Sequence, residues 1–288
     1  MSVPDTEVAV APLPQLVSTD GRTYPLQSAQ LTARAEGGFA TSALTQVFTN
    51  PHAESLEVVY TLPLPVDGAV LGYTITVGER VIRGEIQTRE VARRKYLEAL
   101  EEGRVAGLLE QERAATFEQS LGNIPPLTPV QVVIDVVHPL AFLPAGPRLG
   151  HAASWEYRFP TVAGVRYSGA EGRVADAAQV SPDRSKNGTP TRMNLALTIG
   201  GSSSITGLTS RSHTLVTDDA GVISFAQGEA LDRDVVVSWD ATTQDVGVSV
   251  VEGGGLPGDD GRYVLVTVVP PSDPSVVFSR ELTILLDT

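Results

Sequence analysis

The sequence predicts a mainly β protein: an antiparallel β-sandwich with one packed α-helix and a further, connecting β region. Three observations lead to this fold class. Short runs rich in β-branched residues recur along the 288 residues, and the 27 Gly and 20 Pro that divide them are spread throughout. Only one segment has helical periodicity. Many short strands separated by turn residues are typical of an all-β sandwich.

The first predicted strands alternate apolar and polar residues in part. Residues 1–17 are rich in Pro and lack periodicity, which predicts an N-terminal tail or an added strand. Gly78-Glu79 predicts the tight turn of a β-hairpin. Alternate residues before this turn predict one apolar face of a strand, namely Leu71, Tyr73, Ile75 and Val77. Three strand-like runs precede them, at 28–35, 42–49 and 55–62.

The segment 88–102, TREVARRKYLEALEE, is rich in helix-forming residues. Thr88 is the expected N-cap, and Gly103 is the expected stop. Small or apolar residues recur at spacings of four, three and four, which is one helical face: Ala92, Tyr96, Ala99 and Gly103. We therefore expect a helix whose Ala92/Tyr96/Ala99 face is buried against the sandwich.

The run VQVVIDVVHPL at 130–140 is apolar at successive positions. Val130, Val132 and Ile134 share one face with Val136, and Val133 lies on the other with Val137, which predicts a strand covered on both sides. Residues 163–192 are polar and rich in turn residues, so we expect a long loop or a linker there. Strand-like runs then resume and continue to the C-terminus.

The order of features over residues 56–140 is specific. The run VVYTLPLPVDGAVLGYTITVGERVIRGEI is followed by the predicted helix and then by AGLLEQE, TFEQSLGNIPP and VQVVIDVVHPL. This order resembles the VIT domain, the module shared by vault-associated proteins and inter-alpha-trypsin inhibitor heavy chains. Two places depart from that pattern: residues 126–128 are Pro-Leu-Thr where Gly-Glu is usual, and His138 stands where Tyr is usual. The matching positions are Leu62, Pro63, Leu64, Pro65, Gly84, Ala92, Tyr96, Ala99, Gly103, Ala106, Leu109, Phe117, Gly122, Asn123, Ile124 and Pro125.

Further runs resemble the segment that joins a VIT domain to a von Willebrand factor A domain. They are YRFPTVAGVRY, SRSH at 210–213, LDRDVVVSW at 231–239 and YVLVTVVPP at 263–271. The last residues, RELTILLDT, resemble the first strand of a von Willebrand factor A domain. We therefore divide the chain into an N-terminal tail or added strand (1–17), a VIT domain (18–145), a connecting β region packed with it (146–278) and a first-strand stub (279–288).

Asp287 is the one metal candidate. The resemblance implies that in a complete von Willebrand factor A domain this Asp, two hydroxyls and two further loops hold Mg²⁺. Those partners are absent from the 288 residues, and an isolated carboxylate binds Mg²⁺ weakly because the ion dehydrates reluctantly. We therefore expect no cofactor in this chain. The run ELTILL is apolar on both faces, so we expect residues 280–288 to be poorly ordered or to pair with a neighbouring molecule.

Charge and cysteine content narrow the functional classes. Asp and Glu exceed Lys and Arg by 34 to 21, a formal net charge of −13. Because nucleic-acid binding needs basic patches, we expect no nucleic-acid partner, and anionic membranes are disfavoured for the same reason. The chain has no Cys, so disulfides and thiolate sites are impossible. No signal peptide or membrane-spanning run is visible, so we expect a cytoplasmic protein if Met1 is the natural start.

Other candidate residues favour structural interpretations. The four histidines, His52, His138, His151 and His213, are far apart in sequence and lack ligand spacing. Ser210, Ser212 and His213 lack the strand–turn–helix context of a nucleophile, which favours a polar turn. Arg233, between two Asp residues, is a calcium or ligand contact on one interpretation and a solvated turn before a strand on the favoured one.

We expect a non-catalytic module for protein–protein interaction and scaffolding. The resemblance implies that it packs against a von Willebrand factor A domain, as a protein partner or as the following domain, and helps present the metal site of that domain. The alternative is a β-sandwich that binds or processes glycans. That function requires paired carboxylates in a cleft and an exposed aromatic ring, for which Trp239 beside Asp234 or Asp240 is the candidate.

Overall fold

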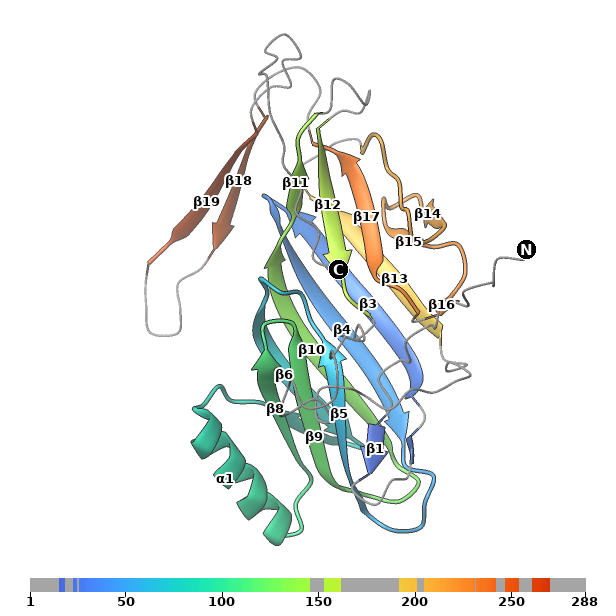
Figure 1. Cartoon of the computed structure of the whole chain (residues 1–288), viewed down its shortest axis with the longest axis vertical. Coiled ribbons are helices and arrows are strands. Elements are labelled where there is room, and N and C mark those ends of the chain that lie inside the picture. Colours follow the sequence, from blue (N-terminus) through green and yellow to red (C-terminus); the bar gives the residue numbers. More distant parts are fainter. Residues whose placement is uncertain are drawn as a thin grey trace, which may run out of the picture.

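The computed structural model confirms a mainly β fold with one helix (Figure 1). The strands form a long sheet with two smaller sheets against it, and a separate two-stranded sheet stands at one side. The structure describes residues 16–18, 23–24, 26–145, 153–161, 192–200, 205–230, 232–241, 247–253 and 261–269.

The long sheet runs through the whole molecule. Its central strands are eleven residues long and bury every second side chain, as a strand with one covered face must. One neighbouring pair, β3 and β13, is parallel; the other pairs are antiparallel. In spatial order the strands are β14 (Leu215–Thr217), β15 (Ile223–Phe225), β13 (Arg192–Ile199), β3 (Leu26–Glu36), β4 (Phe39–Thr49), β10 (Pro129–Pro139), β6 (Ala69–Val77) and β7 (Arg80–Arg83), with β16 (Glu229–Ala230) beside β13.

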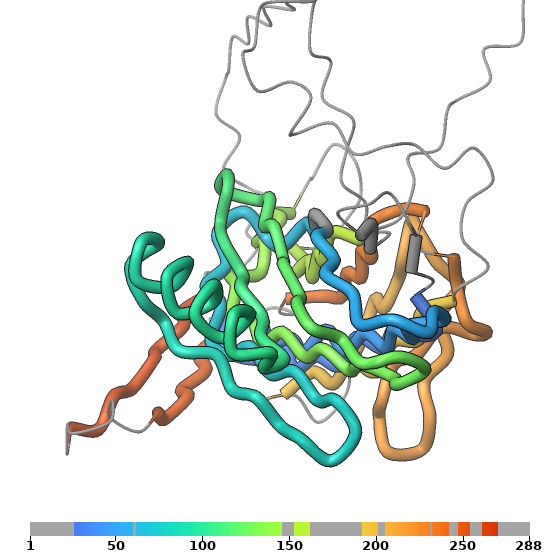
Figure 2. The backbone as a smooth tube through the Cα atoms, turned by 90° about the horizontal axis from the view of Figure 1, so that it is seen from below, coloured from blue at the N-terminus to red at the C-terminus, as the bar shows by residue number. Residues whose placement is uncertain are grey.

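Two smaller sheets cover one face of the long sheet, one at each end (Figures 1 and 2). A single apolar core runs between the layers, and it includes Ile134, Leu62, Tyr157 and Val237. The first sheet contains β2 (Thr23–Tyr24), β1 (Leu16–Ser18), β5 (Leu56–Pro63), β9 (Thr116–Ile124) and β8 (Ala106–Arg113). The second contains β11 (Ala141–Leu143), β12 (Ser154–Phe159) and β17 (Val235–Asp240).

The strands predicted at 28–35, 42–49 and 55–62 are β3, β4 and β5, and the Gly78-Glu79 turn joins β6 to β7. Of the N-terminal segment, β1 adds to the edge of β5. The expected strand covered on both sides is wrong in part. The even positions of β10 are buried, whereas Val133 and Val137 are half-buried, because the small sheets cover only one face of the long sheet there.

The predicted apolar face of β6 is also wrong at one position, Leu71, which is 59% exposed. The pairing of β6 with β10 shifts between Asp135 and Val136, so that Gly72 lies opposite Asp135 and Val70 opposite Val136. Leu71 is therefore the extra residue of a β-bulge, which turns its side chain outward. An added Cβ on Gly72 would lie 2.6 Å from the Asp135 Oδ2, so a larger residue there would require the Asp135 side chain to move.

The predicted helix is α1 (Arg89–Glu101), with Tyr96 and Ala99 buried and Ala92 half-buried. Thr88 is the N-cap residue, but its side chain makes no capping hydrogen bond, contrary to expectation. Gly103 ends the helix in the left-handed region at φ +69°.

The GNI motif holds the helix against β9. The Asn123 Nδ2 donates to the carbonyl oxygens of Leu100 and Arg104, each at 3.0 Å, and so satisfies the end of the helix. A Cβ on Gly122 would overlap the Leu100 side chain. These contacts give a physical reason for Gly-Asn at this place in the sequence.

Candidate functional site: the valine face of the β18–β19 hairpin

The hairpin of β18 (Gly247–Gly253) and β19 (Tyr263–Val269) projects beside the sheets (Figure 1). Its two strands pair in an uninterrupted antiparallel register over seven residue pairs. One face presents apolar side chains opposite one another, such as Val248 opposite Val268 and Val250 opposite Val266. We call this the valine face; its members are 55–62% exposed and are Val248, Val250, Val264, Val266 and Val268.

The other face of the hairpin rests on the turn between β3 and β4. The Thr267 Oγ1 donates a 2.5 Å hydrogen bond to the Gly37 carbonyl oxygen. An added Cβ on Gly37 would lie 2.8 Å from the Val251 Cγ2, and both Gly37 and Gly38 have positive φ, at +60° and +80°. Glycine therefore permits both the turn and the close approach of the hairpin.

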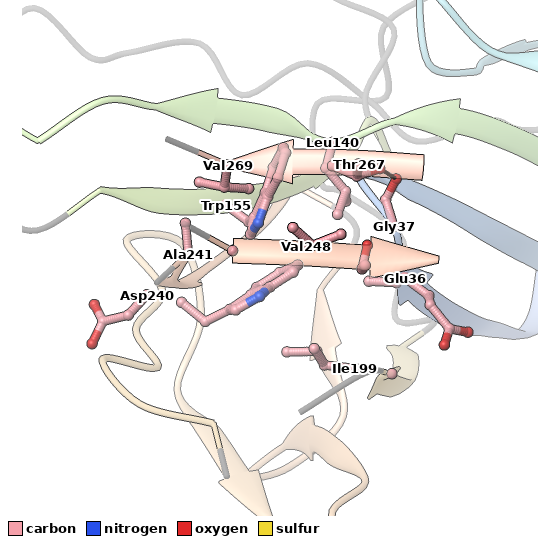
Figure 3. Close-up of a pocket in the computed structure, with 16 residues that line it drawn as sticks. Glu36, Gly37, Leu140, Trp155, Ile199, Asp240, Ala241, Val248, Thr267 and Val269 are labelled. Carbon is pink, nitrogen blue, oxygen red and sulfur yellow. Dashed lines mark hydrogen bonds between the residues drawn. The ribbon is translucent and has the colours of Figure 1, made fainter. Parts of the chain in front are cut away.

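A cavity of about 200 Å³ lies between the base of the hairpin and the sheets (Figure 3). Trp155 and Trp239, which are opposite each other on β12 and β17, supply two indole rings. Leu140, Ile199 and Val269 add apolar surface. Figure 3 shows the carboxyl groups of Glu36 and Asp240 at the rim, turned away from the indoles.

This arrangement does not meet the condition set for a glycan site. Trp239 was required to be exposed, but only 6% of it is accessible. Asp234 instead accepts a 3.2 Å hydrogen bond from the Arg158 Nε. Stacking on a sugar ring needs an accessible aromatic face, so the condition for the alternative glycan site is not met at Trp239.

A buried polar group joins the long sheet to β12. The Ser42 Oγ lies 3.0 Å from the Tyr157 hydroxyl and 3.4 Å from the His138 Nε2. All three residues are less than 5% exposed. Burial lowers the pKa of His138 and raises the pKa of Tyr157. Because no substrate can reach them, we assign these side chains to holding the two layers together.

The segment 210–213 is a polar turn, as the sequence favoured. The Ser210 Oγ accepts hydrogen bonds from the backbone N–H groups of Ser212 and His213 and donates to the Val236 carbonyl oxygen. The Ser212 Oγ lies 2.7 Å from the His213 Nδ1 and accepts from the Val236 N–H. These contacts bind the turn to the edge of β17. His213 stacks on Phe225 with ring centroids 4.5 Å apart, and its Nε2 is buried without a hydrogen-bond partner.

Arg233 also has a structural role in this region. It donates to the Ser212 carbonyl oxygen and to Asp232, and it forms an ion pair with Glu229. Burial, followed by the charge of Arg233, lowers the pKa of His213. The solvated turn before β17 is the interpretation that these contacts support.

The remaining candidates are not brought together. Asp287 and His151 lie outside the described residues, as do residues 163–191 and 280–288. His52 and His138 are in separate parts of the fold. Among the described residues there is no group of three or more His, Asp or Glu side chains placed to hold a metal ion. No helix in the described ranges is long and apolar enough to cross a membrane.

The sequence predicts strand-like runs through this part of the chain, but it does not predict the valine face. The signal was present: Val248 and Val250 alternate along one strand, and Val264, Val266 and Val268 along the other. The register that places them on the same face is the part that only the structure supplies.

Residues 26–136 match the family model described as Vault protein inter-alpha-trypsin domain, which confirms the VIT resemblance. The chain is 30% identical over 141 residues to human protein mono-ADP-ribosyltransferase PARP4, covering 49% of this chain and 8% of that protein. It is 27% identical over 229 residues to rat von Willebrand factor A domain-containing protein 5A, covering 76% of this chain and 27% of that protein. The chain thus spans less than a third of either relative.

Among solved structures, native yeast LTA4 hydrolase aligns at a TM-score of 0.42 and 9% identity, covering 86% of this chain and 32% of that one. A likeness this low carries no argument about activity.

Proposed function

We propose, from the VIT domain at residues 26–136, that the chain is a non-catalytic protein–protein interaction module that supports a von Willebrand factor A-type domain. The family match and the von Willebrand factor A relatives support the general role in protein interaction. That the partner is a von Willebrand factor A-type domain is the more specific part of the proposal.

The observation that carries the proposal is the valine face. The largest contiguous apolar patch on the surface of a soluble protein is often functional. Val248 and Val250 lie opposite Val268 and Val266 and form a continuous apolar surface, which ends where Val264 lies opposite Glu252. A stable interface between free partners needs roughly 800 Å² on each side. The valine face has five residues against the roughly 20–30 on each side of such an interface, which favours a partner held close by a tether.

The tether is short. Residues 270–279 separate β19 from residue 280, at which the resemblance to a von Willebrand factor A strand begins. A domain that starts there would be held near the valine face at an effective concentration in the millimolar range. In this proposal Asp287 contributes to the metal loop of that domain together with residues the domain supplies. The net charge of −13 supports a protein partner rather than a nucleic acid.

The test joins the von Willebrand factor A domain of the rat relative to this chain in register at Asp287. Mg²⁺ affinity is then measured by titration calorimetry with and without residues 1–278. We expect Mg²⁺ to bind at least fivefold more tightly when residues 1–278 are present. Equal Mg²⁺ affinities would contradict the supporting role. A separate glycan-array screen tests the alternative function, and we expect the 288-residue chain to bind no glycan.

A further inference from the structure

The chain has two tryptophans, and both line the cavity at the base of the β18–β19 hairpin (Figure 3). Trp155 on β12 and Trp239 on β17 lie opposite each other in an antiparallel register. Opposite residues share one face of a sheet, with their Cβ atoms about 4.5–5.5 Å apart. A small molecule in the cavity can therefore contact both indole rings.

The two indole N–H groups are unused donors. An indole nitrogen donates but does not accept, and a buried Trp usually has a partner for this donor. In the part of the chain that the structure describes, neither Trp155 nor Trp239 donates its indole N–H to an acceptor. Trp239 is only 6% exposed, so its donor depends on what occupies the cavity.

The rest of the lining favours an uncharged ligand. Leu140 and Ile199 supply apolar walls, and none of the described Lys or Arg residues lines the cavity. At the rim, the Glu36 carboxylate accepts hydrogen bonds of 2.8 and 3.0 Å from the Arg34 guanidinium. Asp240, also at the rim, forms no ion pair within the described ranges. An anionic ligand would therefore face the charge of Asp240 without a compensating cation.

The volume of about 200 Å³ suits a small molecule. Because a cavity of roughly 150 Å³ takes up benzene, this one has room for roughly eight to ten non-hydrogen atoms. A carbonyl oxygen accepts two hydrogen bonds, so one carbonyl group is sufficient for both indoles. We propose that the cavity binds a small uncharged ligand with an apolar body and a carbonyl acceptor, such as a carboxamide. Binding here requires no von Willebrand factor A domain, so it is independent of the proposed function.

Tryptophan fluorescence tests the site directly, because every tryptophan of the chain lines the cavity. The probe is cyclohexanecarboxamide, which is uncharged and of suitable size, and its matched control is the anion cyclohexanecarboxylate. We expect the amide to change the fluorescence with a Kd of about 1 mM or lower, and the carboxylate to bind at least tenfold more weakly. Equal binding of the two compounds, or no saturable change with the amide, would overturn the proposal.

Two substitutions test the donors one at a time. Trp155→Phe and Trp239→Phe each keep an aromatic ring and remove one N–H group. We expect each to weaken amide binding about three- to tenfold in calorimetric titration, the effect of losing one hydrogen bond. Tyr157→Phe is the matched control, since it removes a buried hydroxyl from β12 outside the cavity, and it should leave the affinity unchanged. Thermal melting confirms that each variant is folded. Unchanged affinity in both Trp variants, or an equal loss in Tyr157→Phe, would contradict the assigned donors.

Nuclear magnetic resonance gives a measurement that needs no variant. The ¹⁵N-labelled chain has two indole N–H signals, one from each tryptophan. We expect cyclohexanecarboxamide to move both signals, because both donors gain an acceptor, and the carboxylate at the same concentration to move neither. If the amide moves only one signal or none, the shared site is wrong.

Discussion

The helix α1 and the β18–β19 hairpin both lie at the periphery of the molecule, but they differ in how their apolar residues are used. Tyr96 and Ala99 of the helix are each 7% exposed, and Arg93 ties the helix to Glu110 of β8 through a 2.8 Å hydrogen bond. The valines of the hairpin are more than half exposed. An apolar face predicts that something covers it. The apolar face of the helix is covered by β8 of the same chain. The apolar face of the hairpin is exposed, which is consistent with the proposed partner.

The largest expected effect is on the helix side. Tyr96 packs against the first small sheet, and its hydroxyl donates a 2.9 Å hydrogen bond to Glu57. We expect Tyr96→Ala to lower the free energy of unfolding by about 3–5 kcal/mol, the range for removing a buried aromatic side chain. Chemical denaturation measures this. The control is Leu97→Ala, since Leu97 is 57% exposed on the same helix; a loss below ~1 kcal/mol for Tyr96→Ala would mean the helix face is not packed.

Matched valine substitutions test the contrast directly. Val132, on β10, is fully buried, whereas Val266 is 55% exposed. We expect Val132→Ala to cost roughly 2 kcal/mol, because two methyl groups leave the core. Val266→Ala should change stability by less than about 0.5 kcal/mol, as for other surface positions. Similar losses at both positions in urea denaturation would show that the valine face is already covered.

The stability of the buried core should also depend on pH, through His138 on β10. Burial lowers the pKa of His138, so the unfolded chain, with an ordinary His pKa near 6.5, binds the proton more readily than the folded chain. His138 therefore contributes stability above pH 6.5 that is lost as the pH falls through its lowered pKa. We expect the free energy of unfolding to decrease between pH 8 and pH 5.5, and to decrease less in His138→Gln. Parallel pH profiles for the two proteins would contradict this role.

A smaller, stabilising change is expected at Leu127. This residue is 72% exposed and its backbone is left-handed, with φ +52°. This conformation is strained for most residues other than Gly and Asn. It lies in the segment where the VIT pattern usually has Gly-Glu. We expect Leu127→Asn to raise the free energy of unfolding by about 1 kcal/mol. As a control, Leu97→Asn at an exposed position inside the helix should lower the free energy of unfolding. An unchanged or lower free energy of unfolding for Leu127→Asn would exclude strain at this turn.

The smallest effect concerns Mg²⁺. One carboxylate, Asp287, is a poor site for an ion that dehydrates reluctantly. A ligand at its own Kd adds only about 0.4 kcal/mol to stability. We therefore expect millimolar Mg²⁺ to leave the melting temperature of the 288-residue chain unchanged. A rise that disappears in Asp287→Ala would show that the chain binds the ion by itself.

Sequence reasoning was reliable where local patterns decide the structure. The spacing of Ala92, Tyr96 and Ala99 predicted the helix, and Gly78-Glu79 predicted the hairpin turn. The predictions failed where the structure depends on strands that are distant in the sequence. The bulge that exposes Leu71 depends on how β6 pairs with β10. The site behaves in the same way, because the valine face exists only once β18 and β19 are in register.

The central claim is that the valine face holds a von Willebrand factor A-type domain. The most direct measurement is calorimetric melting of the chain joined at Asp287 to the domain of the rat relative, compared with its Val250→Lys/Val266→Lys variant. We predict one cooperative transition for the parent and two separate transitions for the variant, because charged side chains cannot be buried unpaired in an apolar interface. Two transitions in both proteins, or one in both, would contradict the claim.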